Sequence, residues 1–488
     1  MEMSHRGPEG ESLLRTDPRA VVMPQNSTRP TGWDGTDTEK APFLRNEPVK
    51  LTPAWEGSNL PNDTLNLKGI AMDLVPPKDK WNLIYFTLML HGLGTLTAWN
   101  MFITAKSYFE DYKLVKGSEL SNNYLVYVGS AAQIPNFLFS WFNVFVEIGG
   151  DLTNRIVWSL SMEVLIFVVT IVLAMVDSRA WTPAFFWLTM ASVLLMNTFN
   201  AIFQNSVYGV AARLPPQYTG AVVLGSNICG TLVTLLSWAT DEFSESARTA
   251  AIYYFIGGMF VLLICFDTYF ALPLNRFYRY HDTLQQRTLR VNPALAATTQ
   301  GSAVKTRPPY GTIIKQAWVQ LYNIFIIFFV TLAVFPAVQS NIVSTQGLLG
   351  ANFVRITCFL TFNVMAMLGC VSASLLPWPR PRWLSVLTTL RILFIPFFLV
   401  CNYSVPGRTL PVLVTSDWAY WAGAALLAWS SGHCSSLAMM YVSGTVAPEN
   451  AAKAGMMGGA MLVTGIMCGI FFSRLGSVIA TLPLWAGL

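Results

Sequence analysis

Long apolar stretches of about 20 to 25 residues alternate with short polar breaks from Trp81 to the end of this 488-residue chain. As a helix, each stretch is long enough to cross the ~30 Å hydrocarbon core of a bilayer. The pattern predicts eleven spans, at residues 82–105, 124–146, 156–176, 183–209, 218–240, 250–273, 316–340, 352–377, 383–404, 415–441 and 454–482. We therefore expect an all-α polytopic membrane protein with eleven transmembrane helices.

Two polar segments lie outside the spans. Residues 1–81 are rich in charged residues, Pro, Gly, Ser and Thr and lack a long apolar run, which is typical of a disordered tail. Residues 274–315 form a long basic loop. This loop divides the chain into helices 1–6, at 82–273, and helices 7–11, at 316–488.

Composition supports the membrane interpretation. Hydrophobic residues make up 53% of the chain and charged residues only 12%, whereas soluble domains carry about 25% charge. This excludes an ordinary soluble protein and a disordered chain. The net charge of +5 is too small to indicate a nucleic-acid partner, so the expected surroundings are the lipid bilayer.

The loop charges predict the orientation. Twelve Lys and Arg residues lie in loops on the side of the basic loop, against six on the opposite side. By the positive-inside rule, the N-terminus is cytoplasmic and the C-terminus extracellular. We expect the plasma membrane. Glu9, Leu13 and Leu14 have the spacing of an acidic dileucine sorting signal that trafficking adaptors could bind, so an endosomal or lysosomal membrane is the alternative.

Neutral hydrogen-bonding side chains recur within four spans. In hydrocarbon they mark either contacts between helices or the pathway of a solute. They are Thr95, Trp99 and Asn100 in the first span, Gln133, Asn136 and Asn143 in the second, Asn197, Asn200, Gln204 and Asn205 in the fourth, and Thr361 and Asn363 in the eighth. This set suits a carrier for small, uncharged, polar aromatic solutes. Amides that only bridge neighbouring helices are the alternative.

Ionisable groups deep in the spans are few, whereas an ion channel or proton pump needs rings or relays of acids. We interpret four charged residues as structural or gating ties: Glu163, Asp267, Arg391 and Arg474. His91 and His433 are interpreted as neutral hydrogen-bonding groups. All seven cysteines lie within spans, as small buried apolar residues.

Closely spaced glycines predict where helices approach one another. Gly92 and Gly94 lie in the first span. The last span carries Gly455, Gly458 and Gly459, followed by Gly465 and Gly469, with pairs four residues apart. Small residues at such spacing allow the backbones of two membrane helices to come close. We expect both groups to form helix-packing faces.

A series of motifs runs in order through the chain. It comprises Pro76-Pro-Lys-Asp-Lys-Trp-Asn, Gly92-Leu-Gly-Thr-Leu with Trp99-Asn100, Gln204-Asn-Ser-Val-Tyr-Gly209, Leu214-Pro-Pro-Gln-Tyr-Thr219, Cys358-Phe-Leu-Thr-Phe-Asn363, Arg382-Trp-Leu, and Arg391 followed by Pro396 and Cys401-Asn402. With these motifs the chain resembles the equilibrative nucleoside transporter family, from about Pro76 to its end.

The resemblance implies a major-facilitator-like arrangement of six plus five helices. It also implies facilitative transport of nucleosides by alternating access, without a cofactor. Carried over by motif, the residues lining the substrate site would be Leu96, Trp99 and Asn100 from the first span, Gln133 and Asn136 from the second, Gln204 from the fourth, and Phe359 and Asn363 from the eighth. Gln204 would contact the nucleobase.

The chain departs from the family in the eighth span. Ala366 and Cys370 stand where the family usually carries an Asp and an Arg. Losing both together avoids a stranded buried charge, which would cost roughly 3–5 kcal/mol, and is expected to leave a larger, less polar cavity. Asn200 stands where a Gly is common and could supply a replacement amide.

The leading hypothesis is a facilitative nucleoside carrier whose 82–273 part rocks against its 316–482 part. One alternative is a divergent carrier of nucleobases or organic amines. Another is a non-transporting, receptor-like member that has lost the Asp/Arg pair. An enzyme is not expected, because the spans contain no intramembrane Asp pair, metal-ligand cluster or nucleophile–base motif.

Overall fold

A computed structural model describes residues 77–106, 108–114, 120, 124–146, 151–291 and 309–482, together with two short strands. The strands, β1 (Val49–Lys50) and β2 (Thr64–Leu65), pair with each other, and every other regular element described is helical. Most of the predicted tail, including Glu9, Leu13 and Leu14, lies outside the described residues.

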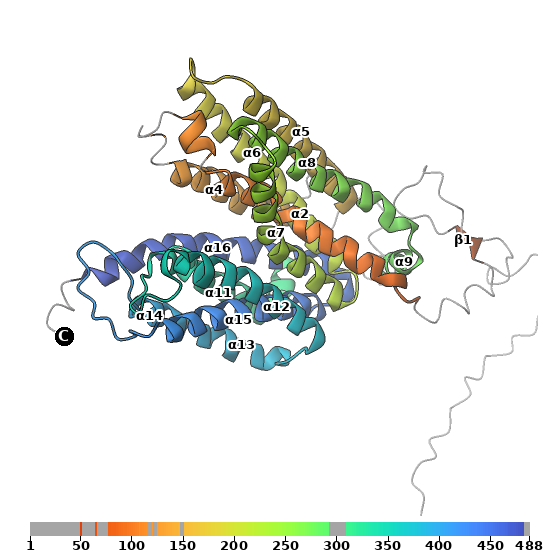
Figure 1. Cartoon of the computed structure of the whole chain (residues 1–488). Coiled ribbons are helices and arrows are strands. Elements are labelled where there is room, and N and C mark those ends of the chain that lie inside the picture. The colour runs from red at the N-terminus through yellow and green to blue at the C-terminus, as the bar shows by residue number, and fades with distance from the viewer. Residues whose placement is uncertain are drawn as a thin grey trace, which may run out of the picture. The chain divides into compact units, whose positions relative to one another are not determined.

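The first half consists of six long helices: α2 (Leu83–Thr104), α4 (Tyr124–Phe145), α5 (Leu152–Met175), α6 (Thr182–Ala211), α7 (Pro216–Glu242) and α8 (Ala247–Ala271) (Figure 1). Short turns accompany them: η1 (Lys80–Asn82), η2 (Tyr108–Lys113) and η3 (Leu272–Leu274). Prolines in the first turns of α6 and α7 suit a position that lacks an N–H partner. The Ser246 hydroxyl caps α8 by accepting the Thr249 N–H at 3.2 Å.

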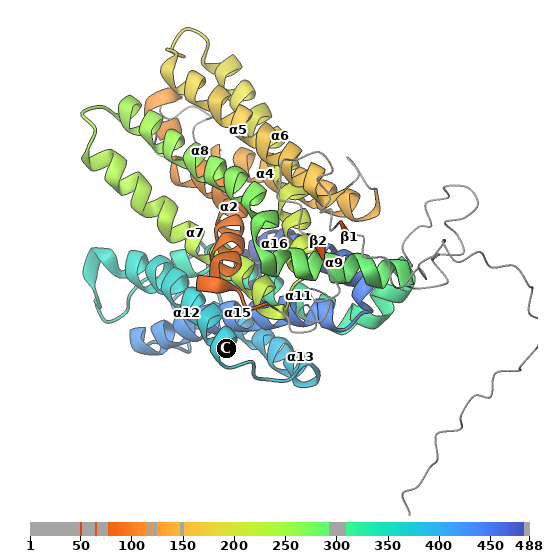
Figure 2. The same cartoon turned by 90° about the vertical axis from the view of Figure 1, so that its right-hand side faces the viewer.

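The second half contains α11 (Tyr310–Val334), α12 (Thr361–Leu375), α13 (Pro381–Leu390), α14 (Phe394–Leu399), α15 (Asp417–Gly444) and α16 (Ala451–Ala480). Its turns are η4 (Gln339–Asn341), η5 (Gly350–Asn352), η6 (Arg355–Leu360), η7 (Arg391–Leu393) and η8 (Pro448–Asn450). Part of the predicted basic loop forms a further helix, α9 (Arg276–Val291). In two views, α4, α5, α6 and α8 gather on one side and α11, α12, α13 and α15 on the other (Figures 1 and 2).

Every predicted span coincides with helix, and eight helical segments of the described chain are long and apolar enough to cross a membrane. The predicted spans outside those eight coincide with α2, α4 and α15, which carry many of the polar residues. The all-helical fold is confirmed, while the number of eleven spans stays a prediction. In the ninth span, α13 and α14 are joined by the 3-10 turn η7 into one helical segment, Pro381–Leu399.

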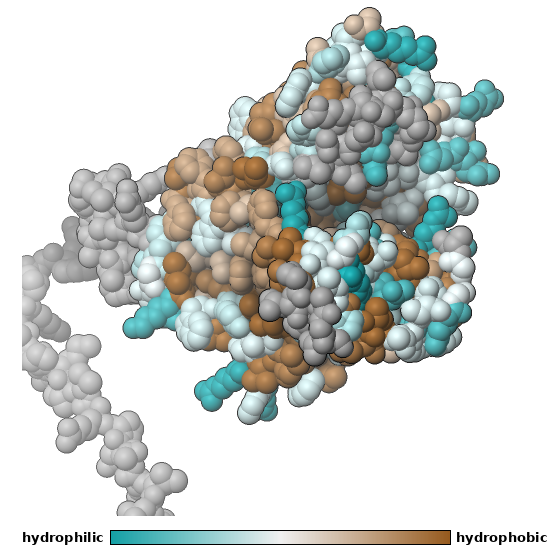
Figure 3. Space-filling model, turned by 90° about the vertical axis from the view of Figure 1, so that its left-hand side faces the viewer, coloured by the Kyte–Doolittle hydropathy of each residue, from teal (hydrophilic) through white to brown (hydrophobic). Residues whose placement is uncertain are grey.

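The flanks of the helices expose large apolar side chains, among them Trp158, Trp187, Trp238 and Phe260. Figure 3 shows residues of high hydropathy, drawn in brown, gathered in broad patches on one face. Soluble proteins rarely expose apolar patches of this kind, because water would surround them. A bilayer solvates them, as the hydrophobic composition predicts.

The helices within each half pack backbone against backbone. A Cβ on Gly92 of α2 would lie 2.0 Å from the Val222 carbonyl oxygen of α7, and a Cβ on Gly225 of α7 would lie 1.8 Å from the Met89 carbonyl oxygen. In the second half, a Cβ on Gly465 or Gly469 of α16 would lie 2.6 Å from a carbonyl oxygen of α11. The predicted glycine packing faces are confirmed.

One arginine organises the loop between α14 and α15. The Arg408 guanidinium donates to the carbonyl oxygens of Leu399, Cys401, Tyr403, Leu410 and Pro411, at 2.7–3.3 Å. Partial burial lowers the pKa of this guanidinium below its usual value. The planar fork of an arginine suits several carbonyls at once, whereas a lysine ammonium carries only three donors on a flexible chain.

Arg408→Lys is therefore expected to destabilise the protein by about 2 kcal/mol although the charge is retained. A lower midpoint of thermal unfolding and faster proteolysis of residues 400–416 would be measured in detergent. The exposed Arg382→Lys is the control and should change neither. Equal midpoints for Arg408→Lys and the unmodified chain would contradict the expectation.

Candidate functional site

Helix α7 links the polar residues of α2 to those of α12. The Thr95 hydroxyl of α2 lies 3.2 Å from the Ser226 hydroxyl of α7. The Asn100 amide donates to the Leu96 carbonyl at 3.0 Å and to the Cys229 sulfur at 3.5 Å. The predicted site residue Asn100 is thus oriented toward α7. This follows from the close crossing of the two helices at Gly92 and Gly225.

Leu96 and Trp99 lie on the same helix and are half-buried against the core. They sit within one turn of Asn100, so the three predicted α2 residues form one patch. A half-buried indole retains a face for stacking on a flat solute, which a fully packed core residue would lack.

Helix α12 approaches the other side of α7. Asn363 is half-buried, and its amide oxygen would lie 3.2 Å from a Cβ on Gly230 of α7. Cys370 accepts a hydrogen bond from the Asn227 amide of α7 at 3.3 Å. Phe359, in η6, is 42% exposed and its ring lies 6.0 Å from that of Phe335. The structure thus brings Asn363 toward α7, while the Phe359 ring packs against that of Phe335.

The residues missed by sequence reasoning lie on α7 itself: Ser226, Asn227, Cys229 and Gly230. Their run of small and polar residues inside an apolar span was the available signal. Because α7 touches both α2 and α12, these residues lie between the two predicted groups.

Helix α6 carries the densest set of buried amides. Asn197, Asn200, Gln204 and Asn205 are almost fully buried. Within the described residues, the side-chain oxygen of each of the four lacks a hydrogen-bond donor. Buried acceptors normally have a partner, so a cluster without one calls for an explanation. A solute that carries N–H or O–H donors would satisfy them once the neighbouring helices part, because in this structure the oxygens are sealed from the surface.

Two of the amides in the first half bridge helices, as the alternative interpretation expects. The Asn205 amide donates to the Ser140 carbonyl of α4 at 2.8 Å. Asn143 of α4 donates to the Ile202 carbonyl of α6 at 3.3 Å and accepts from Arg155 at 3.1 Å. These residues are structural, whereas Asn200 and Gln204 remain candidates for binding.

The predicted site residues of α4 lie on a helix that packs beside the buried amides of α6. Gln133 and Asn136 are both half-buried. The Gln133 side-chain oxygen is without a donor in the part of the chain described here, and Asn136 accepts from Ser140 at 3.4 Å. Helix α4 packs along α6, so the two helices present these amides from adjacent positions.

Ala366 and Cys370 do not line an open space. Both are fully buried, and the Cys370 thiol donates to the Gly432 carbonyl of α15 at 3.5 Å. A Cβ on Gly432 would lie 1.9 Å from the Ala366 carbonyl oxygen. The expected larger cavity is therefore not found at these two residues, because α15 packs directly against them.

The two histidines differ from each other. The His433 Nε2 donates to the Trp378 carbonyl at 2.6 Å, and its Nδ1 lies 2.8 Å from the Ser372 hydroxyl. This confirms the interpretation of His433 as a hydrogen-bonding core residue. For His91 the interpretation is wrong: among the described residues neither ring nitrogen has a hydrogen-bond partner, and the ring packs against Phe203.

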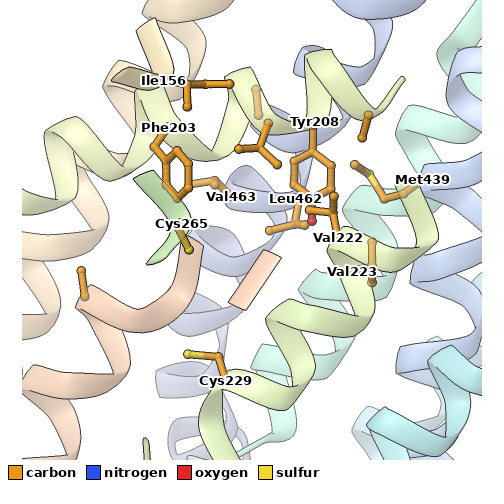
Figure 4. Packing of buried hydrophobic residues seen from close by; sticks show 14 of the residues in the cluster. Ile156, Phe203, Tyr208, Val222, Val223, Cys229, Cys265, Met439, Leu462 and Val463 are labelled. Carbon is orange, nitrogen blue, oxygen red and sulfur yellow. The ribbon is translucent and has the colours of Figure 1, made fainter. Parts of the chain in front are cut away.

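The two halves contact each other at the end of the bundle that bears α9. Met456 of α16 lies against Gly209 of α6, and Met440 of α15 against Gly220 of α7. Figure 4 shows Tyr208 of α6 between α7 and α16. We call the contact formed by these five residues the seam.

Hydrogen bonds join the halves beside the seam. Trp141 of α4 donates to the Thr464 hydroxyl of α16 at 2.9 Å. Tyr310 of α11 and Lys453 of α16 both donate to the Val144 carbonyl at the end of α4, at 3.1 and 3.5 Å. A helix C-terminus carries partial negative charge and suits such donors. This end of the bundle is therefore closed.

Comparison with known proteins identifies close sequence relatives. The family described as Nucleoside transporter matches residues 190–476. The chain is 29% identical to equilibrative nucleoside transporter 1 of Homo sapiens over 451 residues, which cover 82% of this chain and 98% of that protein. It is also 29% identical to equilibrative nucleoside transporter 3 of Rattus norvegicus, covering 76% and 84% of the two chains.

Among solved structures, the chain resembles the major facilitator superfamily proton:xylose symporter XylE. The TM-score is 0.56 at 12% identity, over 83% of this chain and 94% of the other. At this identity the likeness concerns the fold alone. The major-facilitator-like arrangement expected from the sequence is confirmed.

Proposed function

Because this chain belongs to the nucleoside transporter family, we propose that it is a facilitative carrier that moves nucleosides across a membrane by alternating access. The family is one of carriers, so the chain is not an enzyme. The protein is a multi-pass membrane protein whose substrate is a small polar aromatic solute.

The row of unsatisfied amide oxygens on α6 supports a nucleoside most directly. A nucleobase offers N–H donors and a ribose offers hydroxyls, and both are neutral. A neutral site avoids the desolvation of a charge inside the membrane. It also binds weakly enough to release its solute on either side, as a facilitative carrier requires.

We assign the proposed substrate contacts to four helices. They are Leu96, Trp99 and Asn100 of α2, Gln133 and Asn136 of α4, Asn200 and Gln204 of α6, and Phe359 of η6 with Asn363 of α12. In this assignment Trp99 stacks on the nucleobase and Gln204 hydrogen-bonds its edge.

The charge asymmetry of the loops supports a cytoplasmic N-terminus and an extracellular C-terminus. The closed end, with α9 and Lys453, would then face the cytoplasm. In this orientation the seam lies on the cytoplasmic side, and transport requires it to open. Residues 82–273 and 316–482 would move as the two bodies.

Uptake into proteoliposomes tests the proposed function. Purified protein should carry radiolabelled uridine and adenosine inward until the internal concentration equals the external one, and unlabelled uridine inside should accelerate the exchange. Folded protein that moves neither nucleoside faster than empty liposomes would refute it. Accumulation above the external concentration would contradict the facilitative mechanism.

We place the protein in the plasma membrane, with an endosomal or lysosomal membrane as the alternative. A double substitution, Leu13→Ala with Leu14→Ala, separates the two. If trafficking adaptors bind this sequence, imaging should show the protein moving from internal compartments to the cell surface. An unchanged distribution would exclude the dileucine as a sorting signal, and Leu51→Ala serves as a control in the same tail.

A further inference from the structure

A cavity lies within the first half, apart from the proposed substrate contacts. Its volume is about 350 Å³, and it lies among the C-terminal end of α2, η2, the C-terminal end of α7 and the first turns of α8. The side chains that matter are Tyr108, Tyr112, Tyr254, Ser237, Thr240 and Asp241. A cavity of this size is within the range of small-molecule sites.

Aromatic rings form one wall. The rings of Tyr108 and Tyr112 stack at 5.6 Å between centroids, with 23° between their planes. The Tyr254 hydroxyl donates to the Met101 carbonyl at 3.1 Å, and the Tyr108 hydroxyl to the Ala174 carbonyl at 3.5 Å. Because these hydroxyls are tied to backbone, the rings are held in place. The face of an aromatic ring is electron-rich and attracts a cation.

A carboxylate completes the cavity. Asp241 lies in the last turn of α7, and across the described residues it forms no ion pair. The C-terminal carbonyls of α7 add partial negative charge at the same place. Both features favour a positively charged ligand.

Nearby basic groups determine how strongly the cavity favours a positively charged ligand. Lys113 is directed elsewhere: its ammonium donates to the carbonyls of Leu173 and Val176 and lies over the Phe185 ring. Lys106 pairs with Glu110 at 3.6 Å. Arg248, in the first turn of α8, is exposed and acts electrostatically on Tyr108, so its charge opposes a cation in the cavity.

We propose that this cavity binds a small organic ammonium ion, with Asp241 as the counter-charge and the tyrosine rings around the cationic head. Ser237 and Thr240 supply hydroxyls for a polar substituent of the ligand. The site is distinct from the proposed nucleoside contacts, since it shares no residue with them.

Calorimetric titration of the full-length protein in detergent tests the assignment, with choline as the ligand. Choline should bind with a Kd of about 1 mM or tighter. Its neutral isostere, 3,3-dimethyl-1-butanol, should bind at least tenfold more weakly, because only the charge differs. Absence of choline binding, or equal binding of the two compounds, would overturn the proposal.

Substitutions locate the site. Asp241→Asn and Tyr112→Leu should each weaken choline binding by about tenfold, whereas Arg248→Gln should strengthen it. Glu242→Gln is the matched control: it removes the same charge one residue further along, outside the cavity lining, and should change affinity by less than about threefold. Equal effects of Asp241→Asn and Glu242→Gln would show a general surface charge effect and refute the site.

Two further measurements separate a loss of choline binding from a loss of folding and from a failure of the nucleoside carrier proposal. Each variant should unfold at the temperature of the unmodified protein, and Tyr112→Phe, which keeps the ring, should bind choline normally. Uridine uptake is measured in parallel. Choline binding without uridine uptake would refute only the nucleoside carrier, and uptake without choline binding would refute only this cavity's assignment.

Discussion

Gly225→Ala is expected to destabilise the first half by at least about 3 kcal/mol, which is large for a single methyl group. The added Cβ would lie 1.8 Å from the Met89 carbonyl oxygen and 2.8 Å from the Leu93 nitrogen. Both are backbone atoms of α2, so no side-chain rotation relieves the collision and the helices must separate. Separation breaks the contacts of Thr95 and Asn100 with α7 as well.

The measurement is the yield of monodisperse protein after extraction and its midpoint of thermal unfolding. Gly129→Ala is the matched control, because Gly129 also lies within a helix and a Cβ there meets no atom within 4 Å. That control should be neutral or slightly stabilising, since alanine favours helix over glycine. An unfolding midpoint for Gly225→Ala equal to that of Gly129→Ala would contradict the described crossing of α2 and α7.

Gln204→Leu is expected to reduce uridine uptake, as kcat/KM, by about tenfold or more while leaving stability unchanged or higher. The Gln204 side-chain oxygen is buried and, within the described residues, has no donor. Replacing an unsatisfied amide by an apolar group of similar size removes a desolvation cost from the empty protein. The loss then falls on the bound state alone, where the amide would hydrogen-bond the nucleobase.

The adjacent amide provides the comparison. Asn205 donates to the Ser140 carbonyl at 2.8 Å, so Asn205→Leu breaks a bond between α6 and α4 and should lower the unfolding midpoint. Uptake and the unfolding midpoint in liposomes would be measured for both variants. If Gln204→Leu lost stability and activity together, as expected for Asn205→Leu, Gln204 would be a bridge between helices and not a substrate contact.

The positions of the helices could be predicted from sequence because a bilayer imposes a minimum apolar length on each. The contacts of Arg391 could not. Arg391 is buried, and its guanidinium donates to the Thr331 hydroxyl of α11 at 2.8 Å and to the Leu427 carbonyl of α15 at 3.4 Å. Those partners lie 60 and 36 residues away, and no local pattern identifies them. The residue is the structural tie that its position suggested.

In the candidate site, too, some features could be predicted from the sequence and others could not. Amides on α2, α4, α6 and α12 are visible in the sequence because polar groups are rare in apolar spans. Whether an amide bridges two helices depends on which atom another helix presents to it, as the Ser140 carbonyl does for Asn205 and no described residue does for the Gln204 oxygen. The residues of α7 could not be identified from the sequence because their role depends on which helices α7 lies between. Cys229 accepts a hydrogen bond from Asn100 of α2, and Asn227 donates one to Cys370 of α12.

The chemistry of the seam differs from that of the contacts inside each half. Within a half, glycines bring two backbones together, as Gly225 does against α2, and such a contact has one geometry. Across the seam, Gly209 and Gly220 face the flexible thioether side chains of Met456 and Met440, which can repack in many rotamers. Only Gly455 of α16 approaches the α6 backbone among the described seam contacts, since a Cβ on it would lie 2.7 Å from the Tyr208 carbonyl oxygen. The joint between the halves therefore combines one close backbone contact with two compliant methionine contacts. Mechanical load applied to the whole should part the seam first and leave each half intact.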